Sequence, residues 1–406
     1  MKINFKTIMQ VNFKQYDLYL ALSVAGLVVF SVIMMFSASA VMPANPNEPL
    51  YADFFNHLEK VVLGFAVMFF TAFKIDYRLY QEYAKNLYIA AVIILILVLI
   101  MGHSSHGATR WLDLKIFTIQ PSEFVKLITI IFVSDFINRK KHLLQDAKTI
   151  RKLAGLIILG ILLPIFLEND LGTPILISLV CIAMLFCAGI SIKKLAVLIP
   201  VSFLVVIGAI VTKPHRLSRI KGYLSYIVNM DALLQAKELA PSLYQIKRSI
   251  QSLGSGGFFG KGLGNSDLKE SYLPEAYTDF IFPIIGEEFG FLGSLILTTV
   301  FVVILIRGFK ISKNARNTHY TYGEIFYLET TKFYGNDSRA PFGEYLALGI
   351  TLLLIFQVII NLAVAAGLFP TKGLVLPFIS FGGTAMITNM AMAGILLNIS
   401  KTKKSR

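Results

Sequence analysis

Apolar runs of roughly 17–25 residues recur along the chain, and their length restricts its fold more than any other feature, because a helix of that length crosses the hydrocarbon of a bilayer. The composition agrees. Of 406 residues, 55% are hydrophobic and 15% are charged, and the mean hydropathy is +0.68. A water-soluble core cannot bury that much apolar sequence. The sequence therefore predicts an all-α polytopic membrane protein built as a single integral-membrane domain.

About ten transmembrane helices are expected. Lys and Arg gather on alternate connections between the apolar runs, and because positive residues mark the cytoplasmic side, both termini are predicted to be cytoplasmic. The connection 213–279, between the seventh and eighth helices, is then a large external loop, and 310–344 is a cytoplasmic loop. The expected spans are 17–37, 58–74, 86–101, 121–138, 152–168, 171–190, 195–212, 280–306, 346–366 and 377–398.

The net charge of +14 is explained by this topology and by contact with anionic lipid, so a nucleic-acid partner is not implied. Cys181 and Cys187 lie in one expected helix and point to different faces, so they cannot bridge each other. No Cys or His cluster has the spacing of a metal site, and His103 and His106 lie in a Ser/Gly-rich loop where a solvated turn is the favoured interpretation.

The segment 272–288 brings acidic groups to the start of an apolar helix. Glu275 and Asp279 stand before its apolar run, and Glu287 and Glu288 follow about two turns further in. Carboxylates at a membrane usually face a cavity and mark a substrate path. The alternative is an ordinary helix start with Asp279 as N-cap, favoured by the helix dipole. The residues alone leave both interpretations open.

Other polar groups gather at the predicted external ends of helices. Glu123 and Lys126 are three residues apart and share a helix face, where they form either a mutual ion pair or part of a polar cavity. Asp170 lies in a very short turn and is expected to cap the following helix. The glycines of 254–264 depart from a Walker phosphate loop and predict a tight external turn.

The segment 370–383 resembles a re-entrant connector, which is tolerated only where it lines a cavity or packs on protein. Its Lys372 is either an anion-binding cation or a lysine that snorkels to the interface. If the external groups meet in space, cations surround a carboxylate at the outer lipid interface, and this arrangement suits a substrate with an anionic headgroup and a lipid tail. The candidate residues are Asp279, Arg110, Glu123, Lys126, Asp170, Arg216, Arg219, Lys261, Glu275, Lys372 and Ser380.

Six segments, in this order and at the ends of the expected helices, carry a family resemblance that extends from Tyr16 to Leu397. The chain resembles the SEDS family (shape, elongation, division and sporulation) of bacterial peptidoglycan polymerases. The segments Gly262–Ser266 and Pro370–Leu374 make it more similar to the cell-division branch than to the elongation branch. The six segments are GATRWL, QPSEFVKL, LENDLGT, SIQSLGSGGFFGKGLGNS, YLPEAYTDFIFPIIGEEFGFLG and LFPTKGLVLPFISFGG.

The resemblance implies a glycosyltransferase that polymerises lipid II on the outer face of the bacterial cytoplasmic membrane, at the division septum. The family's essential aspartate corresponds to Asp279, which would act as general base on the acceptor GlcNAc 4-hydroxyl, with undecaprenyl pyrophosphate as leaving group. Preplaced cations would stabilise the leaving group. No cofactor is obligatory, and Mg²⁺ or Mn²⁺ would bind only through Asp279 or the substrate phosphates. The candidate cations are Arg110, Lys126, Arg216, Lys261 and Lys372.

The resemblance also implies partners, namely a class B penicillin-binding protein that crosslinks the product and other divisome proteins. The chain departs from the family where Tyr277 replaces the usual histidine before Thr-Asp, and where 310–344 is longer than usual. Three other functions remain open: an elongation-type polymerase, a lipid II flippase and a non-catalytic division scaffold. A secondary transporter is disfavoured, because no internal repeat is visible.

Overall fold

The computed structural model describes residues 15–39, 51–105, 108–113, 118–191, 194–195, 222–228, 241–270, 277–317, 342–370 and 373–401. Within these residues the fold is helical, and seven helices are long and apolar enough to cross a membrane. The prediction of an all-α polytopic membrane protein is confirmed. The seven are α1 (Leu18–Ser39), α2 (Ala52–Phe73), α4 (Ala84–Met101), the continuous run of α6 (Ala147–Ile157), η4 (Ile158–Leu162) and α7 (Leu163–Leu167), α14 (Ile281–Asn317), α16 (Phe342–Ala365) and α17 (Gly383–Ser400).

Two further helices occupy predicted spans. These are α5 (Pro121–Lys140), which carries several charged side chains, and α8 (Gly172–Cys187), which has 16 residues. Nine of the ten predicted spans are therefore helical, and the tenth, 195–212, lies outside the described residues except for its first position. The shorter elements are α3 (Tyr77–Glu82), η3 (Lys141–Leu143), α12 (Pro241–Ser255), α13 (Asp267–Glu270), β1 (His103–Ser105), β2 (Ala108–Asp113) and β3 (Thr118–Ile119).

Several boundaries differ from the predicted ones. Helix α2 begins at Ala52 and not at 58, and the polar side chains of Asp53 and His57 in its first turns are buried. Helix α14 runs to Asn317, so the first part of the predicted cytoplasmic loop 310–344 is helical. Helix α17 begins at Gly383, because 377–382 is non-helical although apolar.

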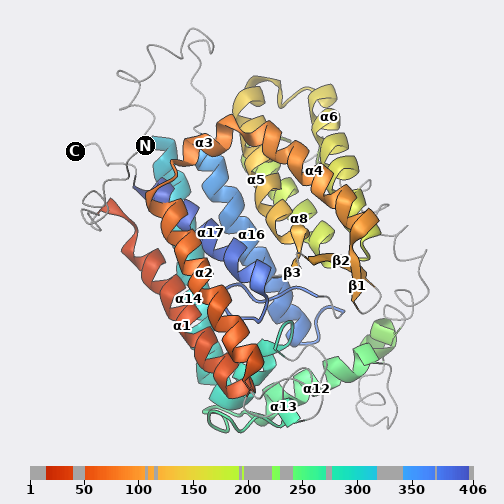
Figure 1. Ribbon diagram of the computed structural model, residues 1–406, viewed down its shortest axis with the longest axis vertical. Helices are drawn as coiled ribbons and strands as arrows, with labels where there is room; N and C mark the ends of the chain where they lie inside the picture. Colours follow the sequence, from red (N-terminus) through yellow and green to blue (C-terminus); the bar gives the residue numbers. More distant parts are fainter. Residues whose placement is uncertain are drawn as a thin grey trace.

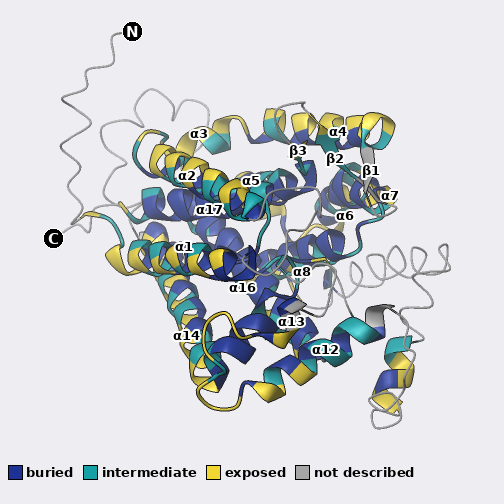
Figure 2. Cartoon of the chain, turned by 60° about the horizontal axis from the view of Figure 1, so that its bottom comes forward, coloured by how far each residue is buried: buried dark blue, intermediate teal, exposed yellow. Residues whose placement is uncertain are grey.

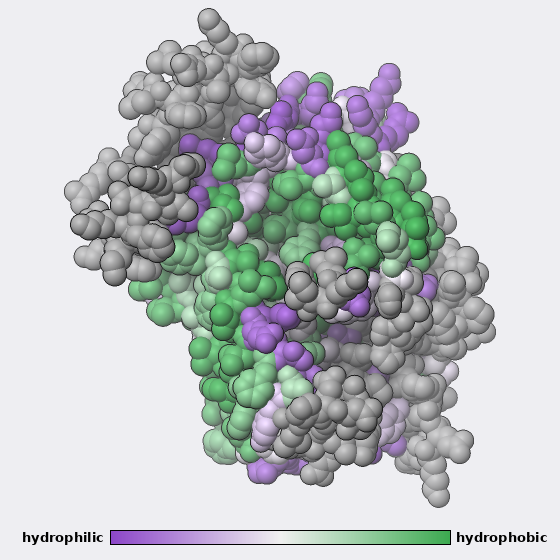
Figure 3. Space-filling model, viewed as in Figure 1, coloured by the Kyte–Doolittle hydropathy of each residue, from purple (hydrophilic) through white to green (hydrophobic). Residues whose placement is uncertain are grey.

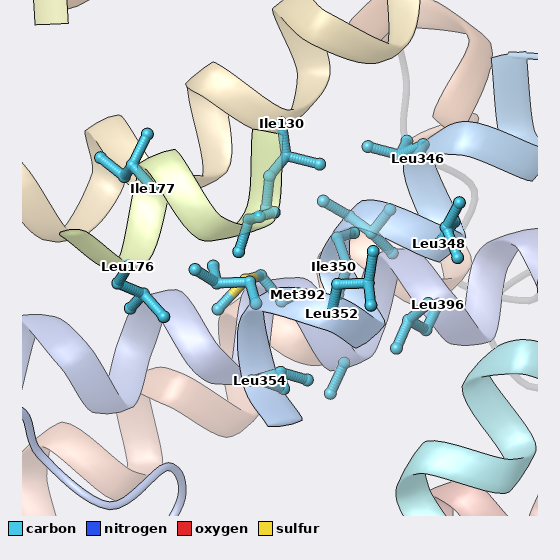
Figure 4. Packing of buried hydrophobic residues seen from close by; sticks show 14 of the residues in the cluster. Ile130, Leu176, Ile177, Leu346, Leu348, Ile350, Leu352, Leu354, Met392 and Leu396 are labelled. Carbon is cyan, nitrogen blue, oxygen red and sulfur yellow. The ribbon is translucent and has the colours of Figure 1, made fainter. Parts of the chain in front are cut away.

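Helices α16 and α17 form the centre of the bundle, with α1 and α2 on one side and α4, α5 and α8 on the other (Figure 1). Figure 2 shows α16 and α17 largely buried and the outer face of α4 exposed. Side chains from α5, α8, α16 and α17 interdigitate in the core, among them Ile130, Leu176, Leu352 and Met392 (Figure 4). The helices long enough to cross a membrane therefore surround a core of side-chain contacts, and polar groups can be buried between these helices.

The two ends of the described chain lie together. The backbone N–H of Asp17 donates to Ser400 Oγ at 3.1 Å, and that of Tyr77 donates to Asn398 Oδ1 at 3.0 Å. Arg307 on α14 donates to the Asp17 carboxylate. The basic connections mark this end as cytoplasmic. In Figure 1, α12 and α13 lie at the opposite end, and Figure 3 shows hydrophobic side chains over much of the middle of the described surface.

A small antiparallel sheet, in the order β1-β2-β3, interrupts the helical fold at the external end. The sequence predicted a Ser/Gly-rich loop here. The sheet holds Arg110 and Trp111 in β2 beside the start of α5. It therefore gives a fixed backbone to a stretch that would otherwise be a flexible connection.

Helix α14 is broken at Gly290, whose φ of 67° and ψ of −163° are non-helical. The break frees backbone groups that the glycine-rich loop 256–264 then satisfies: Phe291 N donates to Gly257 O at 2.9 Å, and Lys261 N donates to Glu287 O at 2.9 Å. A Cβ on Gly260 would lie 2.2 Å from the Glu288 carbonyl oxygen, so only glycine allows this approach. The predicted tight turn is confirmed.

Candidate functional site

Asp279 lies in a turn, residues 277–280, directly before α14 begins at Ile281. Two hydrogen bonds from other elements fix this turn. Phe381 N donates to Tyr277 O at 2.9 Å, and Asn361 Nδ2 on α16 donates to Asp279 O at 3.0 Å. The Asp279 side chain is half-buried. The backbone that carries the carboxylate is therefore held rigidly while the side chain stays partly accessible.

The segment 373–382 is the non-helical neighbour of this turn. Asn361 Nδ2 also donates to Leu374 O at 2.7 Å, and Gln357, one turn earlier on α16, donates to Val375 O at 2.8 Å. Leu376 N donates to Ser380 Oγ at 2.7 Å. The side chains of Leu374, Leu376 and Phe378 are buried. The predicted re-entrant connector thus packs on protein, as irregular backbone at membrane depth must.

Arg110 reaches this site from β2. Its Nη2 donates to Asn169 O at 2.6 Å. A Cβ on Gly373 would lie 3.3 Å from Asp279 Oδ2 and 3.8 Å from Arg110 Nη1. A carboxylate and a guanidinium therefore converge beside a glycine that leaves room for both. The sequence left it open whether these two residues meet, and the structure brings their charged groups near the same glycine.

Glu123 and Lys126 form the predicted pair on the first turns of α5. Lys126 Nζ lies 2.8 Å from each carboxylate oxygen, and both side chains are buried. The first turn of α5 is joined to α17, since Gln120 N donates to Thr384 Oγ1 at 3.1 Å. The ion-pair interpretation is confirmed. Because Lys126 is satisfied by Glu123, its charge is largely compensated there.

Asp170 and Ser380 both hold backbone. Asp170 Oδ1 accepts from Gly172 N at 2.9 Å and from Thr173 N at 3.3 Å, while Oδ2 accepts from Thr173 Oγ1 at 2.8 Å. Asp170 thus caps α8, as expected from its position. Ser380 Oγ accepts from the Leu376 amide. In the structure, both side chains shape the site through the backbone.

Lys261 is not placed beside Asp279, contrary to the expected constellation. Its Nζ lies 2.6 Å from Asp267 Oδ2 and 2.6 Å from Glu287 Oε1. The hydrogen bonds that Lys261 donates to Asp267 and then to Glu287 raise its pKa, so Lys261 stays charged and paired with these two carboxylates. This pairing could not be predicted from the sequence, because Asp267 and Glu287 lie 6 and 26 residues from Lys261 and no local pattern joins all three.

A second lysine of the external loop, Lys269, pairs with Glu288 and donates to Ser37 Oγ on α1 at 2.6 Å. Both charged side chains are 0% exposed. Sequence reasoning missed this buried pair, although a buried charged side chain needs a partner of opposite charge. The pair connects the external loop to α1 through Ser37 and to α14 through Glu288.

Three predicted site residues, Arg216, Glu275 and Lys372, lie outside the described residues, as does Arg219. Tyr277, which replaces the family's histidine, is half-buried. Burial raises its pKa, and the nearby Asp53 carboxylate adds to the increase. The phenol is therefore neutral at physiological pH and cannot take the part of an imidazole base. Of the side chains in the described turn 277–280, the Asp279 carboxylate is therefore the one suited to accept a proton.

No group of three or more His, Cys, Asp or Glu side chains that could hold a metal occurs in the part of the chain that the structure describes. Asp279 offers one carboxylate with a guanidinium nearby. Such a donor set fits a divalent ion only if most of its other ligands come from a substrate.

Asn361 is the positioning residue that sequence reasoning missed. A signal was present: Gln357 and Asn361 lie four residues apart in an apolar run, which puts two amides on one face of α16. Both are buried and bond to the segment 373–382. Glu168 was missed as well. It is buried beside Asn169 and Arg110, within a turn that was considered only for its cap.

Comparison with known proteins decides the family. The family model described as "Cell cycle protein", FtsW/RodA/SpoVE, matches residues 18–405. The chain belongs to the FtsW/RodA/SpoVE family. It is 36% identical over 392 residues to a probable peptidoglycan glycosyltransferase FtsW of Trichlorobacter lovleyi, covering 95% of this chain and 93% of the relative. It is 32% identical to the stage V sporulation protein E of Bacillus subtilis, covering 95% of this chain and 97% of the relative.

Solved structures agree with this FtsW/RodA/SpoVE fold. The chain superimposes on the rod shape determining protein RodA of Thermus thermophilus with a TM-score of 0.63 and 23% identity, covering 96% of this chain and 98% of that one. It superimposes on a chain from a peptidoglycan synthase complex with a TM-score of 0.71 and 23% identity, covering 95% and 97%. The likeness shows a shared SEDS architecture across nearly the whole chain.

Proposed function

We propose that the protein is a peptidoglycan glycosyltransferase that polymerises lipid II into glycan strands. The observation that carries the proposal is the convergence of Asp279 Oδ2 and Arg110 Nη1 beside Gly373 at the external end of the bundle. The names of full-length relatives at 32–36% identity support the reaction class. Lipid II combines a disaccharide, a diphosphate and a lipid tail, so its headgroup meets this site when its tail lies in the outer leaflet.

In the proposed reaction, the Asp279 carboxylate accepts the proton of the acceptor GlcNAc 4-hydroxyl. The hydroxyl oxygen then bonds to C1 of the donor MurNAc, and the bond from C1 to the phosphate oxygen breaks. Undecaprenyl pyrophosphate leaves with the bonding electrons, and Arg110 stabilises the charge that develops on it. General-base assistance of this kind is worth about 10²–10⁴-fold in rate.

Arg216 and Lys372 are the further cations we propose for the diphosphate, and Glu275 for the sugar. The proposal needs no cofactor held by the chain. Mg²⁺ or Mn²⁺ would arrive with the substrate phosphates and could bind Asp279. Glu123 and Lys126 would shape the wall of the site as a buried pair.

We place the enzyme in the bacterial cytoplasmic membrane, in the division branch and at the septum. The FtsW names of several relatives support that branch. The proposed partners are a class B penicillin-binding protein and other divisome proteins. The likeness to a chain of a peptidoglycan synthase complex that coordinates polymerization and crosslinking supports a transpeptidase partner.

The test is a gel of glycan products from the purified protein and lipid II, with and without the cognate transpeptidase. We expect strands from the wild type and at least about 100-fold less product from Asp279→Asn. Asp267→Asn is the matched control, because Asp267 belongs to the same external region but its side chain is 82% exposed and pairs with Lys261. Polymerisation by Asp279→Asn at the wild-type rate would refute the assignment, and lipid transport without polymer would favour a flippase.

A further inference from the structure

The turn between α7 and α8 contains a buried carboxyl group that the mechanism above does not use. Glu168 is 0% exposed, and neither of its oxygens has a hydrogen-bond partner among the described residues. Its neighbour Asp170 differs, because its oxygens are satisfied by the start of α8. Leaving a buried carboxyl unpaired costs free energy, so its presence beside the site needs an explanation.

Arg110 connects this turn to Asp279. Its Nη2 donates to Asn169 O at 2.6 Å, while Nη1 lies on the Gly373 side, where Asp279 Oδ2 also lies. Its Nε is buried and has no partner among the described residues. Arg110 therefore interacts electrostatically with Glu168 and shares the Gly373 side with Asp279, while one of its N–H groups has no partner within the described part of the chain.

The charge on Glu168 depends on its surroundings. In this turn, outside the helices, burial raises its pKa to about 8, the Asp170 carboxylate adds to the increase, and Arg110 opposes it. The elements packed against α7 are η4, α4 and α8, and η4 has no titratable side chain. The titratable groups on α4, α8 and β2 are Lys85, Tyr88, Cys181, Cys187, Arg110 and Asp113.

We propose that Glu168 is a positioning residue: while uncharged, it leaves Arg110 directed at Asp279 and the substrate diphosphate, and on losing its proton it draws the guanidinium back to the 168–170 turn. The physical reason is competition between two carboxylates for one cation, which a neutral acid does not enter. The consequence for catalysis rests on the proposed glycosyl transfer. The movement of Arg110 itself does not depend on that reaction.

The first experiment needs no activity. Trp111 is the single tryptophan of the chain and follows Arg110 in β2, so its fluorescence reports on that strand. The purified protein in detergent is titrated from pH 6 to 9.5 in a His103→Gln background, because His103 pairs with Trp111 in strand register. We expect a transition near pH 8 that Glu168→Gln abolishes and that Asp113→Asn, a neighbouring exposed carboxylate, retains.

The second experiment measures KM for lipid II against pH. Between pH 7 and pH 9 the uncharged fraction of Glu168 falls about tenfold, so the ratio of wild-type KM to that of Glu168→Gln should rise by about the same factor. A structural role alone would change KM equally at every pH. Glu168→Leu shows whether the Gln amide substitutes for a neutral carboxyl in packing.

A fluorescence transition that persists in Glu168→Gln, or that is absent from the wild type, would overturn the proposal, as would a KM ratio that is flat with pH. If the wild type makes no glycan at all, the proposed function fails, and the fluorescence titration still decides whether Glu168 controls Arg110.

Discussion

Removing the Lys269 ammonium should destabilise the protein far more than removing the Lys261 ammonium. Lys269→Met leaves Glu288 charged and 0% exposed, with the Gly264 N–H, at 3.1 Å, as its remaining donor in the described structure. Breaking one side of a buried ion pair costs about 3–5 kcal/mol. Lys261→Met should cost at most about 1 kcal/mol, because Lys261 is partly exposed and exposed pairs contribute little.

The control is closely matched, since Glu287 and Glu288 are adjacent and both lysines come from the same loop. After Lys261→Met, Glu287 still accepts from the hydroxyls of Ser252 and Ser266, each at 2.6 Å. At about 2 °C per kcal/mol, the low end for large chains, Lys269→Met should lower the unfolding midpoint by roughly 6–10 °C. Lys261→Met should lower it by about 2 °C or less.

The assay uses the two cysteines. Cys181 is buried and Cys187 is exposed, so a maleimide dye in a Cys187→Ser background reports heat unfolding through Cys181 alone. The double variant Lys269→Met with Glu288→Leu should recover most of the loss, because an apolar pair replaces the ion pair without leaving a charge. Equal midpoints for Lys269→Met and Lys261→Met would refute the reasoning.

Three further predictions concern the site. Asn361→Leu removes the donor that holds the Asp279 carbonyl. Glycan synthesis should fall at least about tenfold, because a small misplacement of the carboxylate slows the reaction, while binding of lipid II changes less. Equal losses of synthesis and of binding would contradict this prediction. Gly373→Val should impair synthesis more than Gly373→Ala, since the Ala Cβ already lies 3.3 Å from Asp279 Oδ2 and Val adds two methyl groups at that crowded position; identical rates would argue against a role for that space. Relative to Glu168→Gln, the wild type should lose stability as pH rises from about 4.5 to about 8 and remain level above it, by up to about 5 kcal/mol, because the fold prefers the protonated acid; thermal midpoints measured across that range test the sign.

The spans could be predicted because run length and hydropathy are local properties. Their ends could not be predicted in the same way. Residues 377–382 are as apolar as a helix, but they belong to the non-helical segment 373–382, in which Phe378 is buried. Backbone groups of residues 374–376 bond to the side chains of Asn361, Gln357 and Ser380, and the Phe381 N–H donates to Tyr277 O. Hydropathy reports burial and does not report which partner satisfies the backbone.

The candidate site also contains residues whose contacts could be predicted from the sequence and residues whose contacts could not. The sequence indicated Asp279 and Arg110, and the structure brings them together. Lys261 was expected beside them because it is basic and external, but charge alone does not say which acid a lysine meets, and Glu287 is nearer. The pair of Glu123 and Lys126 was predictable, since helix geometry fixes residues three apart on one face.

The most direct test of the account is the initial rate of lipid II polymerisation by Asp279→Asn, measured together with lipid II binding by the same variant. The account predicts a rate reduced by about 10²–10⁴-fold with binding retained, because the carboxylate accepts a proton in the transition state. A rate close to that of the wild type would contradict the role of Asp279 as base.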